Sequence, residues 1–572
     1  MRPDDRPEPI LPLRSRARAA LEAAWGRATA AGALPHVATI ERPAVEVERP
    51  ANPEHGDLAS SIALKLARPC RMAPLRIAEA IAAELAREAS GEVAPADGAP
   101  SAIGSVAVAA PGFLNVRLAD AALAALVNGV LADPASWGHV RAARPRRINV
   151  EFVSANPTGP LHIGNARGAF VGDLLCRVLE AAGHTVTREY YFNDFGAQVH
   201  NLGASVAAVR AGEPLPEEAY RGAYVTDLAA ELPADVWAAA TAADADRAWV
   251  VGAWASERVR AGIEASLAHL GVRFDVWKSE SSLYTDGWVD RAVERLRASG
   301  HLYEQDGALW FRSTDFGDDK DRVVRKSSGD FTYFGSDIGY VVEKFSRGFD
   351  HLVYIWGADH HGTVARLRNA AEAMGFDKTA VQMLLMAWVR FIRDGVEMSM
   401  SKRAGTFVTL DELLSEIGVD AARWFFASRG ANVNIDFDIE LAKKQSSENP
   451  VYYVQYAHAR IASILRRAAE AGLVAATDLS GALAAPAEAT LARVVIRYPE
   501  VVEDAAALQE TQGVTAYATE LATAFHAFYR DAKVVDPADP TRSAARLALV
   551  DATRITLASA LGLLGISAPD AM

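Results

Sequence analysis

A histidine and a glycine stand where a strand is expected to turn into a helix. Residues 148–153 form a buried apolar run, and a turn rich in proline and glycine at 157–160 separates it from a helix that begins near His162. The N-terminus of a helix presents N–H groups and the positive end of its dipole, which favour phosphate. His162 adds a polar donor there, and Gly164 has no Cβ, so a base or ribose can lie against the backbone. We predict a phosphate-binding turn; the structural alternative is that His162 only caps the helix.

A lysine far along the chain could supply positive charge to such a site. Residues 395–410 combine small residues and glycines with Lys402, and a new helix is expected to begin at Leu410. A lysine in a mobile loop suits the charge that develops on a triphosphate during displacement. The alternative is a solvated loop lysine with no role.

The composition describes a folded protein of several domains. The chain has 572 residues, half of them hydrophobic and 23% charged, which predicts two to four domains. Apolar runs are too short for a membrane span, and the N-terminus lacks a secretory pattern, so we expect a cytoplasmic protein without a membrane. Cys70 and Cys176 provide neither a disulfide framework nor a zinc site. The net charge of −13 argues against indiscriminate nucleic-acid binding but permits a local basic face.

Three units are predicted along the chain, and the first spans residues 1–118. Its expected elements are a helix over 11–31, a strand-like run over 44–49, a helix over 58–67 and a hairpin over 103–118. A helix over 119–131 and the basic linker Arg141–Arg147 lead into the second unit. The first unit is therefore expected to be α+β.

The second unit, 119–433, alternates strands with helices, which is typical of a Rossmann-like α/β domain with a parallel sheet. Expected strands cover 148–153, 185–191 and 351–356, and expected helices follow His162 and cover 365–374. Residues from about 200 to 330 are predicted to be an insertion. The third unit, 434–572, has an almost entirely helical pattern.

Two short motifs resemble those of class I aminoacyl-tRNA synthetases. His162-Ile-Gly-Asn165 is similar to the His-Ile-Gly-His element, and Ser399-Met-Ser-Lys-Arg403 is similar to the Lys-Met-Ser-Lys-Ser loop. The surrounding sequence resembles the arginyl-tRNA synthetase family in particular, over segments 52–59, 110–115, 151–162, 188–194, 400–410, 420–424 and 449–460. The resemblance covers nearly the whole chain.

The resemblance implies a ligase that adenylates L-arginine with ATP, releases pyrophosphate and transfers the arginyl group to tRNA(Arg). His162, Asn165 and Lys402 would be catalytic, and the ATP contacts would be His162, Gly164, Asn165, Asp359, Met400, Ser401 and Lys402. Asn165 departs from the usual second histidine and cannot become cationic. Ser399 replaces the first loop lysine and Gly159 replaces a lysine found in some relatives, so Lys402 is expected to carry the charge alone.

Arginine recognition requires carboxylates, because a planar guanidinium pairs best with them. The family pattern maps onto Glu280, Tyr333 and Asp337, and the α-amino and carboxylate end would fall to Ser154, Asn156 and His360. Asp359, His360 and His361 could suggest a metal site. Adjacent histidines point in different directions and no third ligand follows at a suitable spacing, so we expect no protein-held metal and Mg²⁺ only as a companion of ATP.

The helical third unit resembles an anticodon-binding domain. Its aromatic and basic residues could hold unstacked bases and the RNA backbone, and part of this set is expected to be core instead. The tRNA contacts assigned are Tyr452, Tyr456, Arg460 and the C-terminal Met572. The family also implies a monomer and a tRNA-contacting N-terminal unit.

Three other functions remain open from the sequence. Methionyl and cysteinyl synthetases share the class I fold, although two cysteines supply no zinc site for the latter. An RNA-binding paralogue without activity would not need both His162 and Lys402. A nucleotidyltransferase that acts without tRNA would not need the third unit.

Overall fold

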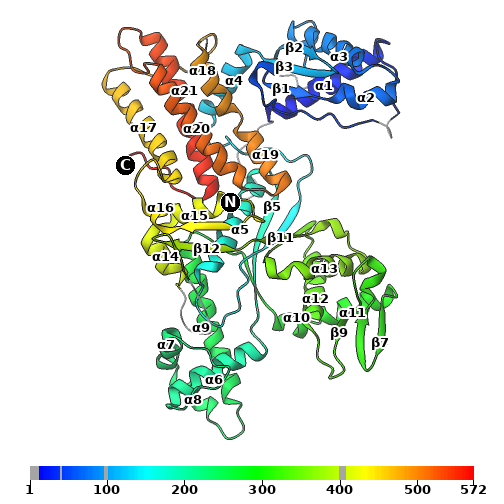
Figure 1. Cartoon of the computed structure of the whole chain (residues 1–572), viewed down its shortest axis with the longest axis vertical. Helices are drawn as coiled ribbons and strands as arrows, with labels where there is room; N and C mark the ends of the chain where they lie inside the picture. Colours follow the sequence, from blue (N-terminus) through cyan, green and yellow to red (C-terminus); the bar gives the residue numbers. More distant parts are fainter. Residues whose placement is uncertain (1–11, 39–41, 96–100, 399–407, 484) are drawn as a thin grey trace.

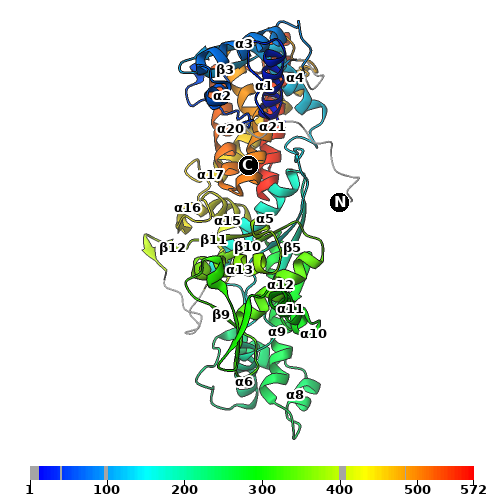
Figure 2. The same cartoon turned by 90° about the vertical axis from the view of Figure 1, so that its right-hand side faces the viewer.

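The computed structural model describes residues 12–38, 42–95, 101–398, 408–483 and 485–572. The molecule is elongated, with the N-terminal unit at one end beside the C-terminal helices and α6–α8 at the other end (Figures 1 and 2). A parallel sheet lies between the two ends. Lys402, Met400, Ser401 and Ser399 fall outside the described residues, so their assigned roles stay predictions.

The N-terminal unit pairs a three-stranded antiparallel sheet, in the order β1-β3-β2, with three helices. Its elements are α1 (Leu13–Ala30), η3 (Pro53–His55), β1 (Leu58–Ser60), α2 (Ile62–Cys70), α3 (Pro74–Ala89), β2 (Ile103–Ala109) and β3 (Phe113–Leu118). The predicted hairpin is confirmed. The helix predicted from Leu58 is wrong at its start, because Leu58–Ser60 pair with β3 before α2 begins. The run over 44–49 contributes only a bridge between Glu48 and Ala59.

A five-stranded parallel sheet, in the order β11-β10-β4-β5-β6, organises the second unit. Its strands are β4 (Arg147–Glu151), β5 (Thr185–Phe192), β6 (Val276–Ser279), β10 (His351–Gly357) and β11 (Val381–Met386). The predicted α/β class is confirmed. The apolar residues of β10 are buried, as expected for a central parallel strand covered on both faces.

Helices cover the sheet, and two separate insertions leave it. The segment predicted as one insertion around 200–330 is interrupted by β6, which returns to the sheet edge beside β5. The sheet helices and the insertions are α4 (Asp120–Ala132), α5 (Ile163–Ala181), α6 (Ala197–Ala211), α7 (Ala223–Glu231), α8 (Ala234–Ala240), α9 (Arg247–His269), α10 (Ser281–Thr285), α11 (Trp288–Ala298), β7 (Leu302–Gln305), β8 (Ala308–Phe311), η4 (Ser313–Phe316), β9 (Arg322–Arg325), α12 (Tyr333–Ser346), η5 (Ala358–His360), α13 (His361–Ala373) and η6 (Lys378–Ala380).

A small sheet leads from β11 to the C-terminal helices. The elements are β12 (Val389–Arg393), β13 (Val396–Glu397), α14 (Leu410–Ile417), α15 (Val419–Ala427), β14 (Ile435–Asp438), α16 (Ile439–Lys443), α17 (Pro450–Glu470), α18 (Pro486–Ile496), α19 (Tyr498–Leu508), α20 (Gln512–Asp531) and α21 (Pro540–Leu564). β14 pairs with β12, so the helical pattern expected from residue 434 begins after this strand. Among the described helices, α21 alone is long and apolar enough to span a membrane, and it packs against α17, α18 and α20.

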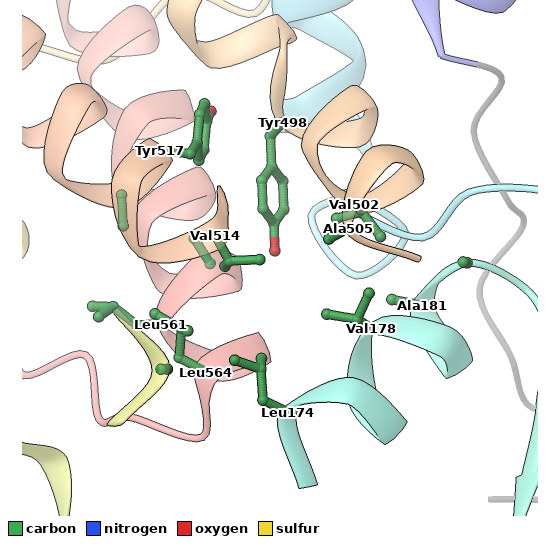
Figure 3. Packing of buried hydrophobic residues seen from close by; sticks show 14 of the residues in the cluster. Leu174, Val178, Ala181, Tyr498, Val502, Ala505, Val514, Tyr517, Leu561 and Leu564 are labelled. Carbon is green, nitrogen blue, oxygen red and sulfur yellow. The ribbon is translucent and has the colours of Figure 1, made fainter. Parts of the chain in front are cut away.

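The C-terminal helices share a hydrophobic core with helix α5 of the sheet. Figure 3 shows Val178 and Ala181 of α5 beside Val502 and Ala505 of α19, with Tyr498 close by. These side chains belong to one buried cluster. The helix that starts at the predicted phosphate turn is therefore anchored at its other end by the third unit.

A buried arginine strengthens this junction. Arg423 of α15 is 2% exposed, and its guanidinium donates to Asp173 of α5 at 2.8 Å and to the Leu564 carbonyl of α21 at 3.1 Å. It also donates to the Leu270 carbonyl at the end of α9 at 2.8 Å. One side chain thus satisfies groups from three other helices.

Replacing Arg423 with methionine should destabilise the protein strongly. Removing Arg423 leaves two buried carbonyls without this donor and leaves Asp173 with Arg177, at 2.8 Å, as its hydrogen-bond donor. We expect a loss of about 3 kcal/mol in the free energy of unfolding. Denaturant titration followed by tryptophan fluorescence measures it. The control is Arg390→Met, because Arg390 pairs with Asp436 at the surface, where a loss below about 1 kcal/mol is expected. Equal losses of unfolding free energy in the two variants would show that Arg423 stabilises the protein no more than a surface arginine does.

Candidate active site

The chain makes an unusual turn where β4 ends. The predicted strand over 148–153 stops at Glu151, and shortly after it Val153 and Ser154 have left-handed backbone angles, φ of 65° and 40°. Residues other than glycine rarely adopt this conformation, and such strain gathers at functional sites. The Ser154 hydroxyl donates to Glu151 Oε1 at 3.3 Å and accepts from the Tyr191 N–H at 3.2 Å. Ser154 is thereby fixed between the carboxyl ends of two strands.

His162 caps helix α5, as the structural alternative proposed. Its Nδ1 accepts from the Gly164 N–H at 3.0 Å, and the His162 N–H donates to Asn165 Oδ1 at 3.2 Å. A Cβ at residue 164 would lie 2.8 Å from the imidazole, so the glycine makes room for this cap. Because Nδ1 is an acceptor, the neutral ring carries its proton on Nε2. The cap therefore prepares His162 as a donor and does not exclude a role toward phosphate.

The segment after the Lys402 loop is attached to the same turn. Thr409 bridges His162, the Ile163 N–H donates to the Val408 carbonyl at 3.2 Å, and the Leu410 N–H donates to the Leu161 carbonyl at 3.0 Å. Thr409 then caps α14 with Glu412, which confirms the helix expected from Leu410. The predicted phosphate turn and the described end of the Lys402 segment are thus hydrogen-bonded to each other.

Two acidic side chains gather near the carboxyl ends of β4 and β6. Glu280 is 5% exposed, and Ser336 donates to its Oε1 at 3.0 Å. Burial raises the pKa of Glu280. Burial, together with the nearby Glu151 and Glu280 carboxylates, raises the pKa of Asp337 to about 7. Carboxyl groups crowded in this way form a site that favours a cation.

Two cationic side chains that the sequence analysis did not predict, Lys344 and Arg347, pair with carboxylates of the sheet near this acidic pair. Lys344 is fully buried, donates to Glu151 Oε2 at 2.6 Å and lies over the rings of Tyr340 and Tyr354. Arg347 holds the buried Glu189 through two hydrogen bonds of 2.7 and 2.8 Å. The sequence carries one sign of this arrangement, since residues 337, 340, 344 and 347 follow one face of α12. Each deeply buried carboxylate of the sheet therefore has its own cation.

Other predicted residues lie around the same edge. Tyr333 begins α12 with 74% of its surface exposed, and Asn156 donates to Gln198 Oε1 at 2.8 Å. Asp359 and His360 follow β10, with an oxygen–nitrogen distance of 3.7 Å between them. In the described part of the chain, no cluster of three or more histidine, cysteine or acidic residues is placed to hold a metal.

Three of the residues assigned to RNA lie on α17, and the fourth, Met572, lies at the end of the chain. Arg460 lies over the rings of Tyr456 and Tyr529, at 6.0 and 4.5 Å from their centres, and Tyr456 is exposed. The chain end is held against α17, because His458 contacts the Pro569 carbonyl at 2.9 Å and Arg466 donates to the Asp570 carbonyl at 3.3 Å. Met572 is exposed and Tyr452 is half-buried. Tyr498 and Phe528, two other aromatic residues of the third unit, are buried, as expected if part of this aromatic set belongs to the core.

Family models match the chain in three consecutive parts. Residues 15–118 match the arginyl tRNA synthetase N terminal domain, and 126–218 with 251–461 match the class I (R) tRNA synthetase catalytic domain. Residues 454–572 match the DALR anticodon binding domain.

Several complete proteins are similar to this chain over most of their length. Arginine–tRNA ligase of Citrifermentans bemidjiense is 44% identical over 93% of this chain and 96% of that protein. The Bacillus subtilis arginine–tRNA ligase is 43% identical over 93% and 95%. Among solved structures, a putative arginyl-tRNA synthetase from Campylobacter jejuni is 33% identical with a TM-score of 0.71, over 80% of this chain and 100% of that one. The Thermus thermophilus arginyl-tRNA synthetase, 23% identical with a TM-score of 0.73 over 97% and 100%, shares the fold.

The raised pKa of Asp337 predicts a cost in stability at neutral pH. Its folded pKa lies above the ordinary value near 3.8, so the folded state holds a proton that the unfolded state has lost, and stability falls as the pH rises toward 7. Asp337→Asn should therefore gain about 2–3 kcal/mol over the parent protein between pH 5 and pH 8. Denaturant titration at both pH values measures the gain. Asp359→Asn, with an exposed carboxylate, is the control, and the same result for both variants would contradict the assignment.

Proposed function

The chain belongs to the arginyl-tRNA synthetase family, and we propose which of its residues perform each part of the reaction. As a class I arginine–tRNA ligase, the protein joins arginine to tRNA in two steps. ATP first converts the arginine carboxylate into an arginyl-adenylate, and pyrophosphate leaves. The arginyl group then passes to the terminal adenosine of the tRNA.

The acidic pair Glu280 and Asp337 recognises the guanidinium group in this proposal, and it is the observation on which the assignment of substrate to site rests. Both carboxyl groups have raised pKa values because of burial. A guanidinium between them would favour their charged forms and form paired hydrogen bonds. Lysine carries a single ammonium and would leave carboxylate oxygens unpaired, so the pocket discriminates without an editing domain. The exposed Tyr333 would close the outer side of the pocket.

The other end of arginine is assigned to the turn after β4. Ser154 is fixed between Glu151 and Tyr191, and this position supports a contact with the α-amino or carboxylate group. Asn156 and His360 are proposed as further contacts. Lys344 pairs with Glu151, the carboxylate to which Ser154 donates. We therefore assign Lys344 to the neutralisation of Glu151 and not to a substrate contact.

ATP is assigned to the turn at the start of α5. His162 Nε2–H would donate to a phosphate, Gly164 would lie under the adenosine, and Asn165 would add an amide donor in place of a cation. Lys402 would stabilise the charge on the α- and β-phosphates during attack by the arginine carboxylate. Met400, Ser401 and Asp359 complete the proposed ATP contacts, and Mg²⁺ enters bound to the triphosphate. The bridge between Thr409 and His162 attaches the segment that follows Lys402 to this turn and supports the assignment.

The C-terminal helices are proposed to hold the tRNA. Tyr456 and Arg460 present an aromatic ring and a cation on one face of α17, which suits a base laid on a ring. Tyr452 and Met572 belong to the same proposed surface. We also propose a monomer that works in the cytoplasm and not on a membrane.

The decisive test of the reaction is ATP–pyrophosphate exchange with arginine. Labelled pyrophosphate should enter ATP when arginine and tRNA(Arg) are both present, and family behaviour predicts that omission of tRNA abolishes it. Each of the other amino acids serves as a control. Exchange driven by methionine or cysteine, or none with arginine and tRNA, would contradict the function.

The substitution Glu280→Gln tests arginine recognition. Losing one charged partner of a guanidinium should lower kcat/KM for arginine about 10²–10³-fold, equal to about 3–4 kcal/mol. The value for lysine should stay near its low level, so the preference for arginine shrinks. Glu294→Gln, on the exposed side of α11, is the matched control. An unchanged kcat/KM for arginine in Glu280→Gln would remove Glu280 from the pocket.

A further inference from the structure

The basic linker between the first two units lines a cavity that contains none of the residues assigned to arginine or ATP. The cavity has a volume of about 500 Å³ and includes Arg141, Arg144 and Arg146 of this linker. Its other walls come from the residues at or just before the starts of β4, β5, β10 and β11, and from α19. It therefore lies at the amino ends of the parallel strands, opposite the edge that holds Glu280 and Asp337.

Positive charge dominates the lining. The nearest acidic wall residue is Glu503, which Arg14 already binds at 2.7 Å and Ser15 at 3.2 Å. Asp377, which faces His351, accepts hydrogen bonds from Thr379 at the start of η6. The three linker arginines outnumber the one acidic wall residue, which Arg14 already pairs, so the recess favours a phosphate group.

Two buried acceptor atoms of the cavity residues lack partners. His351 is 5% exposed, and its Nε2 lies 3.1 Å from Gln382 Oε1, so Nε2 carries the proton and Nδ1 is an acceptor. Burial and the charge of Arg146 lower the pKa of His351, which keeps the ring neutral. Within the described chain, neither His351 Nδ1 nor Gln509 Oε1 has a hydrogen-bond partner. Buried acceptors of this kind normally meet a donor, and a ligand hydroxyl would supply one.

The remaining wall is apolar and rigid. Leu179 and Ala182 come from the end of α5, and Ala506 comes from α19, next to the packed pairs shown in Figure 3. Cavities of 300–1,000 Å³ that combine an apolar wall with a few directed polar groups are typical of small-ligand sites. This recess combines cations for an anion, acceptors for hydroxyls and a surface for a ring.

We propose that this cavity binds a sugar phosphate unit, with the phosphate on the linker arginines and the sugar hydroxyls donating to His351 Nδ1 and Gln509 Oε1. The unit can belong to a free sugar phosphate or nucleotide, or to the ribose-phosphate backbone of the bound tRNA. Both sources present the same chemistry. The site is separate from arginine activation and takes no part in the chemical steps.

Calorimetric titration of the full-length protein with ribose 5-phosphate tests the proposal. Binding should weaken at least tenfold in Arg146→Ala and in Gln509→Ala, and ribose without phosphate should not bind. Arg258→Ala, a surface arginine of α9 with 49% of its side chain exposed, is the matched control and should bind as the parent does. Arginine-dependent pyrophosphate exchange at saturating tRNA should be unchanged in all three variants, which separates this site from the ligase site.

Filter binding of tRNA(Arg) to the same variants distinguishes the two sources. A free ligand predicts ribose 5-phosphate binding with the variant losses above and unchanged tRNA affinity. The RNA backbone predicts a Kd for tRNA at least fivefold higher in Arg146→Ala and Gln509→Ala, with the control unaffected. If these two variants match Arg258→Ala toward both ribose 5-phosphate and tRNA, the proposal is wrong.

Discussion

The crowding of carboxyl groups at one edge of the parallel sheet is the constraint on which the site depends. Burial, together with the nearby carboxylates of Glu151 and Glu280, raises the pKa of Asp337 to about 7. Burying several acids costs free energy unless cations accompany them. Lys344 pairs with Glu151 and neutralises its charge. Part of the free-energy cost of burying Asp337 remains until a cationic ligand binds. In the proposed function, the free site is thus prepared for a guanidinium.

Helix α5 joins this pocket to the rest of the molecule. Its first turn holds the His162 cap and the anchor of the Thr409 segment, and its last turns pack against α19. Arg423 ties its middle to α15 and α21. The same helix therefore supports the proposed phosphate turn, the core shared with the tRNA-binding helices and one wall of the basic cavity. A change in any of these contacts is expected to reach the others through a rigid element.

The sequence predicted the elements with strong local signals and missed those fixed by distant partners. Strand β10 and helix α5 were predictable from a continuous apolar run and a capped start. Strands β6 and β1 lie at sheet edges and have only four and three residues, so neither is long enough to show a pattern that differs from a helix or loop. Lys344 meets Glu151 across 193 residues, and a lysine in a helix is normally solvated. Glu280 and Asp337 followed from family resemblance, because an isolated acid carries no sign of burial.

Proton release on arginine binding tests the central claim most directly. Asp337 with a pKa of about 7 is half-protonated in the free protein at pH 7, and a bound guanidinium should expel that proton. Calorimetry at pH 7 in buffers of different ionisation heats, with tRNA(Arg) present, should give about half a proton released per arginine and none in Asp337→Asn. A binding heat that does not depend on the buffer in the parent protein would contradict the account.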